Sequence, residues 1–308
     1  MTFDIDRLKT RAEEPEMFIK ECEKEYGRKL SAAADAIAEN RKYSPVVLLS
    51  GPSGSGKTTT AMKIEEKLER RGIMARTISL DNYFRDKDDT YPKTQSGELD
   101  LESPLCLDLE LLNEHYELLM EGKPIRVPKF DFTVSKRSPT EYEEIEVGEN
   151  EILIFEGLHA LNGEIAGAHP EAFGLFVCVL SQVDFGENEF LNTWVRLLRR
   201  LVRDKNFRGA EAEYTLELWE NVLDGERKYI TPFKDRAKME IDSFLPYELF
   251  VMRDYALPLL KSARGRAADG GELEKITEML ESIGNIDERL VPKNSLLREF
   301  IGGGIYSY

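Results

Sequence analysis

The residues from Gly51 to Thr58 have the types and spacing that hold a phosphate chain. They read Gly-Pro-Ser-Gly-Ser-Gly-Lys-Thr and match the pattern G-x-x-x-x-G-K-[ST]. Glycines let backbone N–H groups wrap a phosphate, and a helix that starts here adds the partial positive charge of its N-terminus. Lys57 would bridge β- and γ-phosphates, and Thr58 would bind Mg²⁺. The expected donor contacts are Gly51, Ser53, Gly54, Ser55, Gly56, Lys57, Thr58 and Thr59.

Two carboxylates follow apolar runs that are typical of buried strands. Asp81 comes directly after residues 76–80, and Glu156 comes directly after residues 152–155. In an open parallel sheet, functional groups gather at the carboxyl ends of the strands. Phosphoryl transfer needs a carboxylate to accept the proton of the acceptor hydroxyl, and oxygens to hold Mg²⁺ or its waters. We assign the first role to Asp81 and the second to Glu156, with Thr58, Asp81 and Glu156 all near the metal; the alternative is that each carboxylate only caps a turn.

An acidic chain that binds phosphates must concentrate its basic residues in one place, and an arginine-rich segment does so here. Arg196, Arg200 and Arg203 recur at i, i+4 and i+7, which is one face of a helix, and Arg208 follows. Guanidinium groups suit phosphate oxygens and neutralise charge on a transferring phosphoryl group. A helix that closes over the donor would also exclude water. The alternative is a salt-bridge network with the acids of residues 211–226.

Strands and helices alternate along the chain. The patterns predict strands at 46–50, 75–80, 151–155 and 176–180, and helices at 58–71, 107–120, 187–206, 211–229 and 247–265. Such alternation indicates a doubly wound parallel sheet. Short extended pieces between turn residues predict a β-rich insertion at 125–147. Residues 1–43 have helical spacing, and 270–308 are helical and then rich in glycine.

Composition excludes several classes of protein. The net charge is −16, from 42 basic and 58 acidic side chains, which disfavours nucleic acid and membrane surfaces as partners. Three scattered cysteines indicate reduced thiols, with neither a disulfide framework nor a zinc site. No N-terminal apolar segment and no run of roughly 18 apolar residues is present, so we expect a cytoplasmic protein.

The same loop occurs in GTPases, motor ATPases and small-molecule kinases. The chain has no Asn-Lys-x-Asp motif, which a GTPase uses to read its base. A motor ATPase normally ends a strand in Asp-Glu, whereas Phe155 is followed here by Glu156 and Gly157. The pattern favours a kinase for a small molecule.

In their order these motifs resemble the uridine kinase and phosphoribulokinase family over about residues 44–245. The similar segments are 51–58, Leu80–Arg85, Lys129–Phe132 with Arg137, Phe155–Ala160, and Arg196–Asp204 with Arg208-Gly209. The resemblance implies a P-loop NTPase-type three-layer αβα sandwich, with a five-stranded parallel sheet, a β-hairpin insertion and a helical lid. It implies ATP, or another nucleoside triphosphate, with Mg²⁺. Members of the family are often oligomeric, so a homo-oligomer is among the expectations.

The resemblance also implies roles by residue. Asp81 would be the base, with Lys57, Arg200 and Arg203 as further catalytic groups, and Arg203 and Arg208 would contact the donor. Glu102 falls where uridine kinases have an Asp that holds ribose hydroxyls. The expected acceptor contacts are Asp81, Tyr83, Glu102, Phe130, Phe132, Arg137 and Arg200.

Three positions depart from the family pattern. Uridine kinases have a hairpin His that reads the pyrimidine edge, and Ser135 stands there in this chain. Phe130 replaces the usual Tyr, and Ala210 replaces a frequent Arg after Gly209. Because loss of a donor–acceptor pair to a base removes most discrimination, these departures put uridine in question as the acceptor.

We therefore expect Mg-ATP-dependent phosphoryl transfer to a nucleoside or related ribose compound. A sugar-phosphate kinase of the phosphoribulokinase type is the second interpretation, with Lys129, Lys136 or Arg137 holding the acceptor's phosphate. A nucleotide-binding regulator without turnover is the third. The expected organisation is a helical extension (1–43), a kinase core (44–245) with its insertion (125–147) and lid (187–210), and a C-terminal helical region (246–308).

Overall fold

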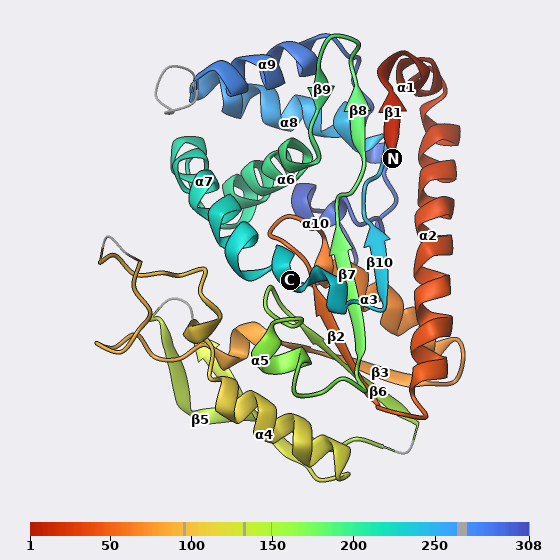
Figure 1. Cartoon of the computed structure of the whole chain (residues 1–308). Coiled ribbons are helices and arrows are strands. Elements are labelled where there is room, and N and C mark those ends of the chain that lie inside the picture. Colours follow the sequence, from red (N-terminus) through yellow and green to blue (C-terminus); the bar gives the residue numbers. More distant parts are fainter. Residues whose placement is uncertain (95–96, 132–133, 149, 264–269, 308) are drawn as a thin grey trace.

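A five-stranded parallel sheet forms the centre of the molecule (Figure 1). The computed structural model describes residues 1–307 except 95–96, 132–133, 149 and 264–269. The strand order is β10-β7-β2-β6-β3. The strands are β2 (Val46–Ser50), β3 (Met74–Ser79), β6 (Glu151–Glu156), β7 (Phe173–Cys178) and β10 (Met239–Asp242). The predicted parallel sheet is confirmed, and its fifth strand, β10, lies where no sequence pattern had located one.

Side chains alternate between the two faces of the sheet, and both faces are covered. Val47 and Leu49 belong to a core shared with helices α2 and α3, whereas Val46 and Leu48 belong to a second core shared with α4 and α5. These helices are α2 (Pro15–Asn40), α3 (Lys57–Glu69), α4 (Leu109–Met120) and α5 (Gly163–Ala166). Burial on both faces explains why the strands are continuous apolar runs. The predicted three-layer αβα arrangement is confirmed.

The terminal segments pack onto the same core as the sheet. The larger apolar cluster runs from Ile5 to Ile301 and includes residues of the N-terminal and C-terminal helices. In Figure 1 the long helix α2 flanks the sheet, and α8 and α9 lie together at one end. The elements involved are α1 (Ile5–Ala12), α8 (Glu248–Ser262), α9 (Gly270–Glu281) and α10 (Arg298–Ile301).

A second, small sheet accounts for one difference from the expected elements. Strand β1 (Thr2–Asp4) pairs in parallel with β8 (Gln182–Asp184), and β8 pairs with β9 (Glu189–Phe190). The helix predicted at 187–206 therefore begins only after β9, as α6 (Asn192–Phe207). Helix α7 (Ala212–Tyr229) follows it. These strands were missed because two or three residues are too few to show an alternating pattern.

The β-rich insertion is an antiparallel hairpin. It consists of β4 (Ile125–Asp131) and β5 (Lys136–Ile145), with an irregularity of register between Pro128 and Phe130. Short 3₁₀ turns complete the fold at Leu80–Tyr83, Pro104–Cys106, Thr231–Arg236 and Glu288–Leu290. Across the described ranges, no helix combines the length and the apolar character needed to cross a membrane.

Candidate active site

Three strand ends bring the phosphate loop and two carboxylates to one edge of the sheet. The loop follows the central strand β2 and leads directly into α3. Glu156 ends β6, where it lies in register with Leu49 of β2 and Ser79 of β3. Asp81 follows β3 by two residues. Parallel strands therefore place the groups predicted for donor, metal and proton transfer beside one another.

The backbone of the loop depends on glycines at two positions. Gly54 and Gly56 have φ values of +74° and +81°, a region that favours glycine. A Cβ on Gly54 would lie 2.8 Å from the carbonyl oxygen of Arg196, and one on Gly56 would lie 2.6 Å from Leu296. Ser55 Oγ is buried in this loop with no hydrogen-bond partner among the described residues. An orphaned hydroxyl in a glycine-built loop at a helix N-terminus fits a bound phosphate.

Lys57, Thr58 and Glu156 form a compact polar cluster at the start of α3. Thr58 Oγ1 donates to Glu156 Oε2 at 3.3 Å, and Lys57 Nζ lies 3.9 Å from Glu156 Oε1. Burial raises the pKa of Glu156 to about 7, although Lys57 opposes this shift. A buried carboxylate beside a threonine hydroxyl is the oxygen-rich setting that Mg²⁺ takes when phosphates and waters supply its other ligands. The described residues contain no group of three or more His, Cys, Asp or Glu that could hold a metal by themselves.

Asp81 lies at the exposed side of this cluster. It belongs to the 3₁₀ turn Leu80–Tyr83, which is capped by Ser79, whose Oγ accepts a hydrogen bond from the Asp81 N–H at 3.2 Å. The carboxylate is therefore not needed as the cap. Although the residue is exposed to solvent, surrounding protein atoms partly desolvate its carboxyl group and raise the pKa of Asp81, while Lys57 and Arg208 act in the opposite direction. A solvent-accessible carboxyl group with a raised pKa near Lys57 suits proton transfer.

Two arginines of α6 are buried and hold the outer side of the phosphate loop. Arg196 donates to the Ser53 carbonyl at 3.2 Å and pairs with Glu226 of α7 at 2.7 Å. Arg199 donates to the Gly54 carbonyl at 3.2 Å and pairs with Glu248 of α8 at 2.7 Å. Arg196 therefore does not share an open face with the other lid arginines; its partner is one of the acids of 211–226, as the alternative interpretation held.

The three remaining arginines of this segment all form ion pairs with one carboxylate. Asp204 lies 3.3 Å from Arg200, 2.9 Å from Arg203 and 3.6 Å from Arg208. Arg200 also donates to Ser53 Oγ at 3.1 Å, which ties it to the phosphate loop. The three arginines predicted for donor and acceptor thus lie together beside the loop.

Glu102 lies between this arginine cluster and α7. It is partly buried, and desolvation raises its pKa although Arg200 opposes the shift. A Cβ on Gly225 would lie 2.5 Å from Glu102, so α7 packs closely against this segment. His159 is buried nearby, edge-on to the ring of Tyr229, and burial lowers its pKa to about 4. The His159 ring is therefore neutral, and its Nδ1 has no hydrogen-bond partner within the described residues.

The hairpin residues expected at the acceptor have mixed placements. Tyr83 is fully buried, with its hydroxyl 2.9 Å from His115 Nδ1. Arg137 pairs with Asp108 at 2.9 Å and donates to the carbonyls of Tyr83 and Phe84. These contacts attach the hairpin to the turn that carries Asp81.

Three further hairpin positions were singled out from the sequence. Phe130 packs at a tilt against Phe84, with ring centroids 5.6 Å apart. Phe132 lies outside the described residues. Ser135, which stands at the position of the family's base-reading His, adopts a positive φ of 52° in the hairpin turn.

Thr59 differs from the other loop residues. Its hydroxyl donates to Glu299 Oε2 at 2.6 Å and its N–H donates to the same oxygen at 3.3 Å. Sequence reasoning missed Glu299, as well as Arg199 and Asp204 as organising groups. The acid after Arg203 and the arginine pair were visible as a pattern, but nothing in the sequence connects residue 299 with residue 59.

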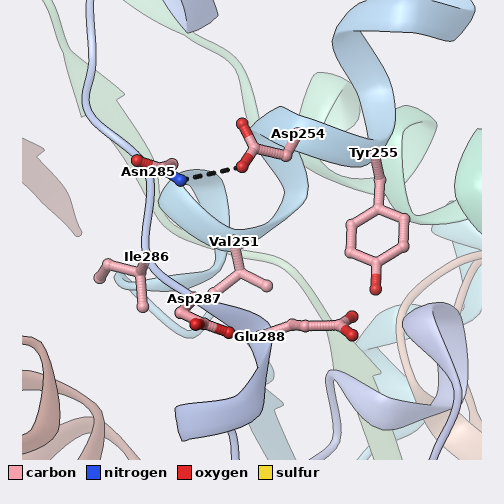
Figure 2. Close-up of a pocket in the computed structure, with 7 residues that line it drawn as sticks. All are labelled: Val251, Asp254, Tyr255, Asn285, Ile286, Asp287 and Glu288. Atoms are coloured by element: carbon pink, nitrogen blue, oxygen red, sulfur yellow. Dashed lines mark hydrogen bonds between the residues drawn. The ribbon is translucent and has the colours of Figure 1, made fainter.

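A separate pocket lies between α8 and residues 285–288 (Figure 2). It measures about 370 Å³ and its lining includes Asp254, Asp287 and Glu288. Asn285 Nδ2 donates to Asp254 Oδ2 at 3.0 Å across it. Three carboxylates repel phosphates, so this pocket is not a second candidate for the nucleotide site.

The sequence of this chain is similar to one protein family and to several proteins of known name. The model described as "Phosphoribulokinase / Uridine kinase family" matches residues 46–248. A uridine kinase of Deinococcus deserti is 31% identical over 221 residues, which cover 72% of this chain and 95% of that protein. A uridine kinase of Halobacterium salinarum is 29% identical over 194 residues, covering 63% and 77%. Uridine-cytidine kinase C of Dictyostelium discoideum is 28% identical over 269 residues, covering 85% of this chain and 54% of its own.

Proposed function

The chain belongs to the phosphoribulokinase / uridine kinase family of P-loop kinases, and we propose that it transfers the γ-phosphate of ATP to a hydroxyl of a nucleoside or related ribose compound. The observation that carries this proposal is the meeting of the phosphate loop, Glu156 and Asp81 at one sheet edge. A nucleotide-binding loop alone would not require a second carboxylate beside it. Phosphoryl transfer requires one.

The loop and the arginines bind and orient the donor. Loop N–H groups and Lys57 hold the β- and γ-phosphates, and Arg200 and Arg203 turn from Asp204 toward the transferring group. Thr58, Glu156 and Asp81 are the residues that would hold Mg²⁺ or its waters, and a bound ion would supply positive charge to the phosphates. The proximity of Arg200 to Ser53 and of Lys57 to Glu156 supports these roles.

Asp81 accepts the proton of the acceptor. The acceptor oxygen forms a bond to the γ-phosphorus, its proton passes to the Asp81 carboxylate, and the bond from phosphorus to the bridging oxygen breaks to release ADP. The raised pKa of Asp81 brings its proton affinity nearer to neutral pH, which supports this assignment. Its position at the exposed side of the cluster gives an acceptor access to it.

An uncharged acceptor is favoured over a sugar phosphate. Lys129 pairs with Glu141 and Arg137 pairs with Asp108, so two of the cations considered for an acceptor phosphate already have acidic partners. Relatives named uridine kinase also support a nucleoside-type acceptor. Glu102, partly buried beside Arg200, is the group that we assign to the ribose hydroxyls.

A panel assay tests the proposal. Purified protein with Mg-ATP is offered nucleosides, nucleotides and pentose phosphates, and phosphorylated products are detected directly by mass spectrometry. We expect product with a ribonucleoside or a related ribose compound. Product only with pentose phosphates would support the phosphoribulokinase type. Tight ATP binding without product from any acceptor would support a regulator and contradict the proposal.

A further inference from the structure

Helix α3, which carries Lys57 and Thr58, lacks a capping side chain of its own. Its N-cap residue is Gly56, which makes no side-chain hydrogen bond to the first turn. The first N–H groups of a helix have no partner inside the helix, and a Ser, Thr, Asp or Asn at the N-cap normally satisfies one of them. Gly56 cannot be replaced by such a residue, because its φ is +81° and a Cβ would lie 2.6 Å from Leu296.

The missing cap comes from the C-terminal segment. Glu299 Oε2 accepts from the Thr59 N–H at 3.3 Å and from the Thr59 hydroxyl at 2.6 Å. Thr59 is the third residue of α3, which is where an N-cap side chain would bond. Thr59 is fully buried and Glu299 is 9% exposed. A carboxylate at a helix N-terminus forms a charge-assisted hydrogen bond and also complements the helix dipole.

Several contacts hold this segment against α3 and α6. Leu296 packs on Gly56, and Ser295 Oγ lies 2.9 Å from the Tyr247 hydroxyl. Asn206 of α6 donates to the Phe300 carbonyl at 3.3 Å, and α10 lies beside α6 (Figure 1). The Tyr306 hydroxyl donates to Glu66 of α3 at 2.6 Å. Residues 295–306 lie outside the family match at 46–248.

We propose that Glu299 is a positioning residue for donor binding, which caps the phosphate-loop helix from outside the family-matched region. The cap fixes the first turn of α3, and with it the direction of the N–H groups and of Lys57 and Thr58 toward the donor phosphates. This inference rests on the proposed function for the identity of the donor, and on the structure alone for the cap.

Substitution of Glu299 tests the cap. The variants are Glu299→Ala, which removes both bonds, Glu299→Gln, which keeps an accepting oxygen, and Glu288→Ala as a control, since Glu288 is an exposed acid of the preceding 3₁₀ turn. We measure the Kd of Mg-ATP by calorimetry, the KM of the acceptor, and hydrogen exchange of residues 57–62. For Glu299→Ala we expect a Kd raised roughly tenfold and faster exchange at 57–62, with the acceptor KM unchanged. Glu299→Gln stays within about threefold of the wild type, and Glu288→Ala matches it.

Several outcomes would overturn the proposal. One is a folded Glu299→Ala protein with unchanged ATP affinity and unchanged exchange at 57–62. Another is a Glu299→Gln protein as impaired as Glu299→Ala, because rescue by an accepting oxygen distinguishes a cap from a general loss of stability. If the Ala variant does not fold, Glu299→Asp, whose arm is one methylene shorter, must show the raised Kd. A wild-type protein that does not bind Mg-ATP overturns the proposed function instead, and the exchange experiment then still tests the cap.

Discussion

Asp81 and Glu156 are chemically alike but lie in different environments. Glu156 is 7% exposed and contacts Lys57 and Thr58, whereas Asp81 is exposed to solvent. A buried carboxylate suits a cation, and an accessible one suits a proton that arrives with the acceptor. The difference in burial supports the two separate roles that we propose.

Replacing Asp81 by Asn tests its role. The amide keeps the size of the side chain but cannot accept the proton, so we expect kcat to fall by roughly 10² to 10⁴. The Kd of Mg-ATP should change little, because the loop holds the phosphates. Steady-state kinetics and calorimetry measure the two quantities, with Asp89→Asn as the control, since Asp89 is an exposed acid of the following loop. A variant with normal turnover would remove Asp81 as the base.

Glu156 and His159 make opposite contributions to the pH dependence of stability. Burial lowers the pKa of His159 from 6.5 to about 4, so the unfolded chain binds the extra proton between these values. The stability from His159 is present above about pH 6.5 and is lost as the pH falls toward 4. The pKa of Glu156 is raised from 4.5 to about 7, so its contribution falls as the pH rises through that window. Each effect is on the order of 3 kcal/mol and the two largely cancel.

His159→Gln should expose the contribution of Glu156. Without the titrating ring, the free energy of unfolding of the variant should increase as the pH falls from 7 to 4.5. The free energy of unfolding of the wild type should increase less over the same interval. Urea titrations at both pH values, without nucleotide or metal, measure this difference. Parallel pH profiles of the two proteins would show that the His159 ring is not buried as a neutral group.

The sequence could predict the residues whose positions are set by local pattern. The loop begins directly after β2, Asp81 follows β3 by two residues and Glu156 is the last residue of β6, so the strand ends fix their positions. It could not predict Glu299, whose partner Thr59 is 240 residues away. Long-range polar pairs depend on tertiary packing and leave no spacing signal in one chain.

At the scale of elements, α6 holds the phosphate loop in place. Its face with Arg196 and Arg199 is buried and bonded to the loop carbonyls of Ser53 and Gly54. When a loop carbonyl is held on the outer side, the N–H group of the same peptide unit points inward, toward the space expected to hold the phosphates. The exposed end of α6 is its last turn, from Lys205 to Phe207, together with Arg208 beyond it, whereas Arg203 is only partly exposed.

The buried pair of Arg199 and Glu248 should be energetically coupled. Both side chains have no exposure, so either single substitution to Ala leaves a buried charge and should lower the free energy of unfolding by about 3–5 kcal/mol. The double variant should lose clearly less than the sum of the two. Chemical denaturation measures the cycle. As a control on the same helix as Arg199, Lys205 forms an exposed pair with Glu211, and Lys205→Ala should cost at most about 1 kcal/mol. Additive losses would mean that the pair is not coupled.

The bounds predicted from sequence were accurate where an apolar run or a helical period was clearly delimited. Strand β2 has the predicted bounds, and α7 differs by one residue at its start. The predicted start of α6 was wrong because two short strands, β8 and β9, precede the helix. Short strands pair through tertiary contacts, and their two or three residues carry too little pattern.

At the scale of the whole molecule, the N-terminal helix belongs to the kinase core. Phe18 of α2 is 1% exposed and packs edge-on against Tyr247 and Phe250. The Tyr26 hydroxyl lies 2.6 Å from Thr60 Oγ1 of α3, so α2 also contacts the phosphate-loop helix. The N-terminal extension expected from charge and helical spacing is therefore packed over its length, and its apolar positions face the sheet layer.

Phe18→Ala should destabilise the entire protein in one transition. Loss of a buried ring leaves a cavity, and we expect the free energy of unfolding to fall by about 3–5 kcal/mol. Far-UV circular dichroism and the fluorescence of Trp194 and Trp219 should give the same midpoint, because one core connects α2 with α6 and α7. The neighbouring Met17 is 56% exposed, and Met17→Ala should change stability by about 0.5 kcal/mol or less. Separate midpoints would show that α2 folds independently.

The contact between Thr59 and Glu299 has a consequence for synthesis on the ribosome. The phosphate-loop helix leaves the ribosome 240 residues before the residue that caps it. At roughly 5–20 residues per second, this delay lasts about 10 to 50 seconds. During that time the nascent chain contains every residue of the loop but not its cap, while Tyr26, which precedes the loop, is already available to Thr60. Acquisition of full nucleotide affinity should therefore wait until residue 299 has been synthesised, well after the last strand of the central sheet, β10.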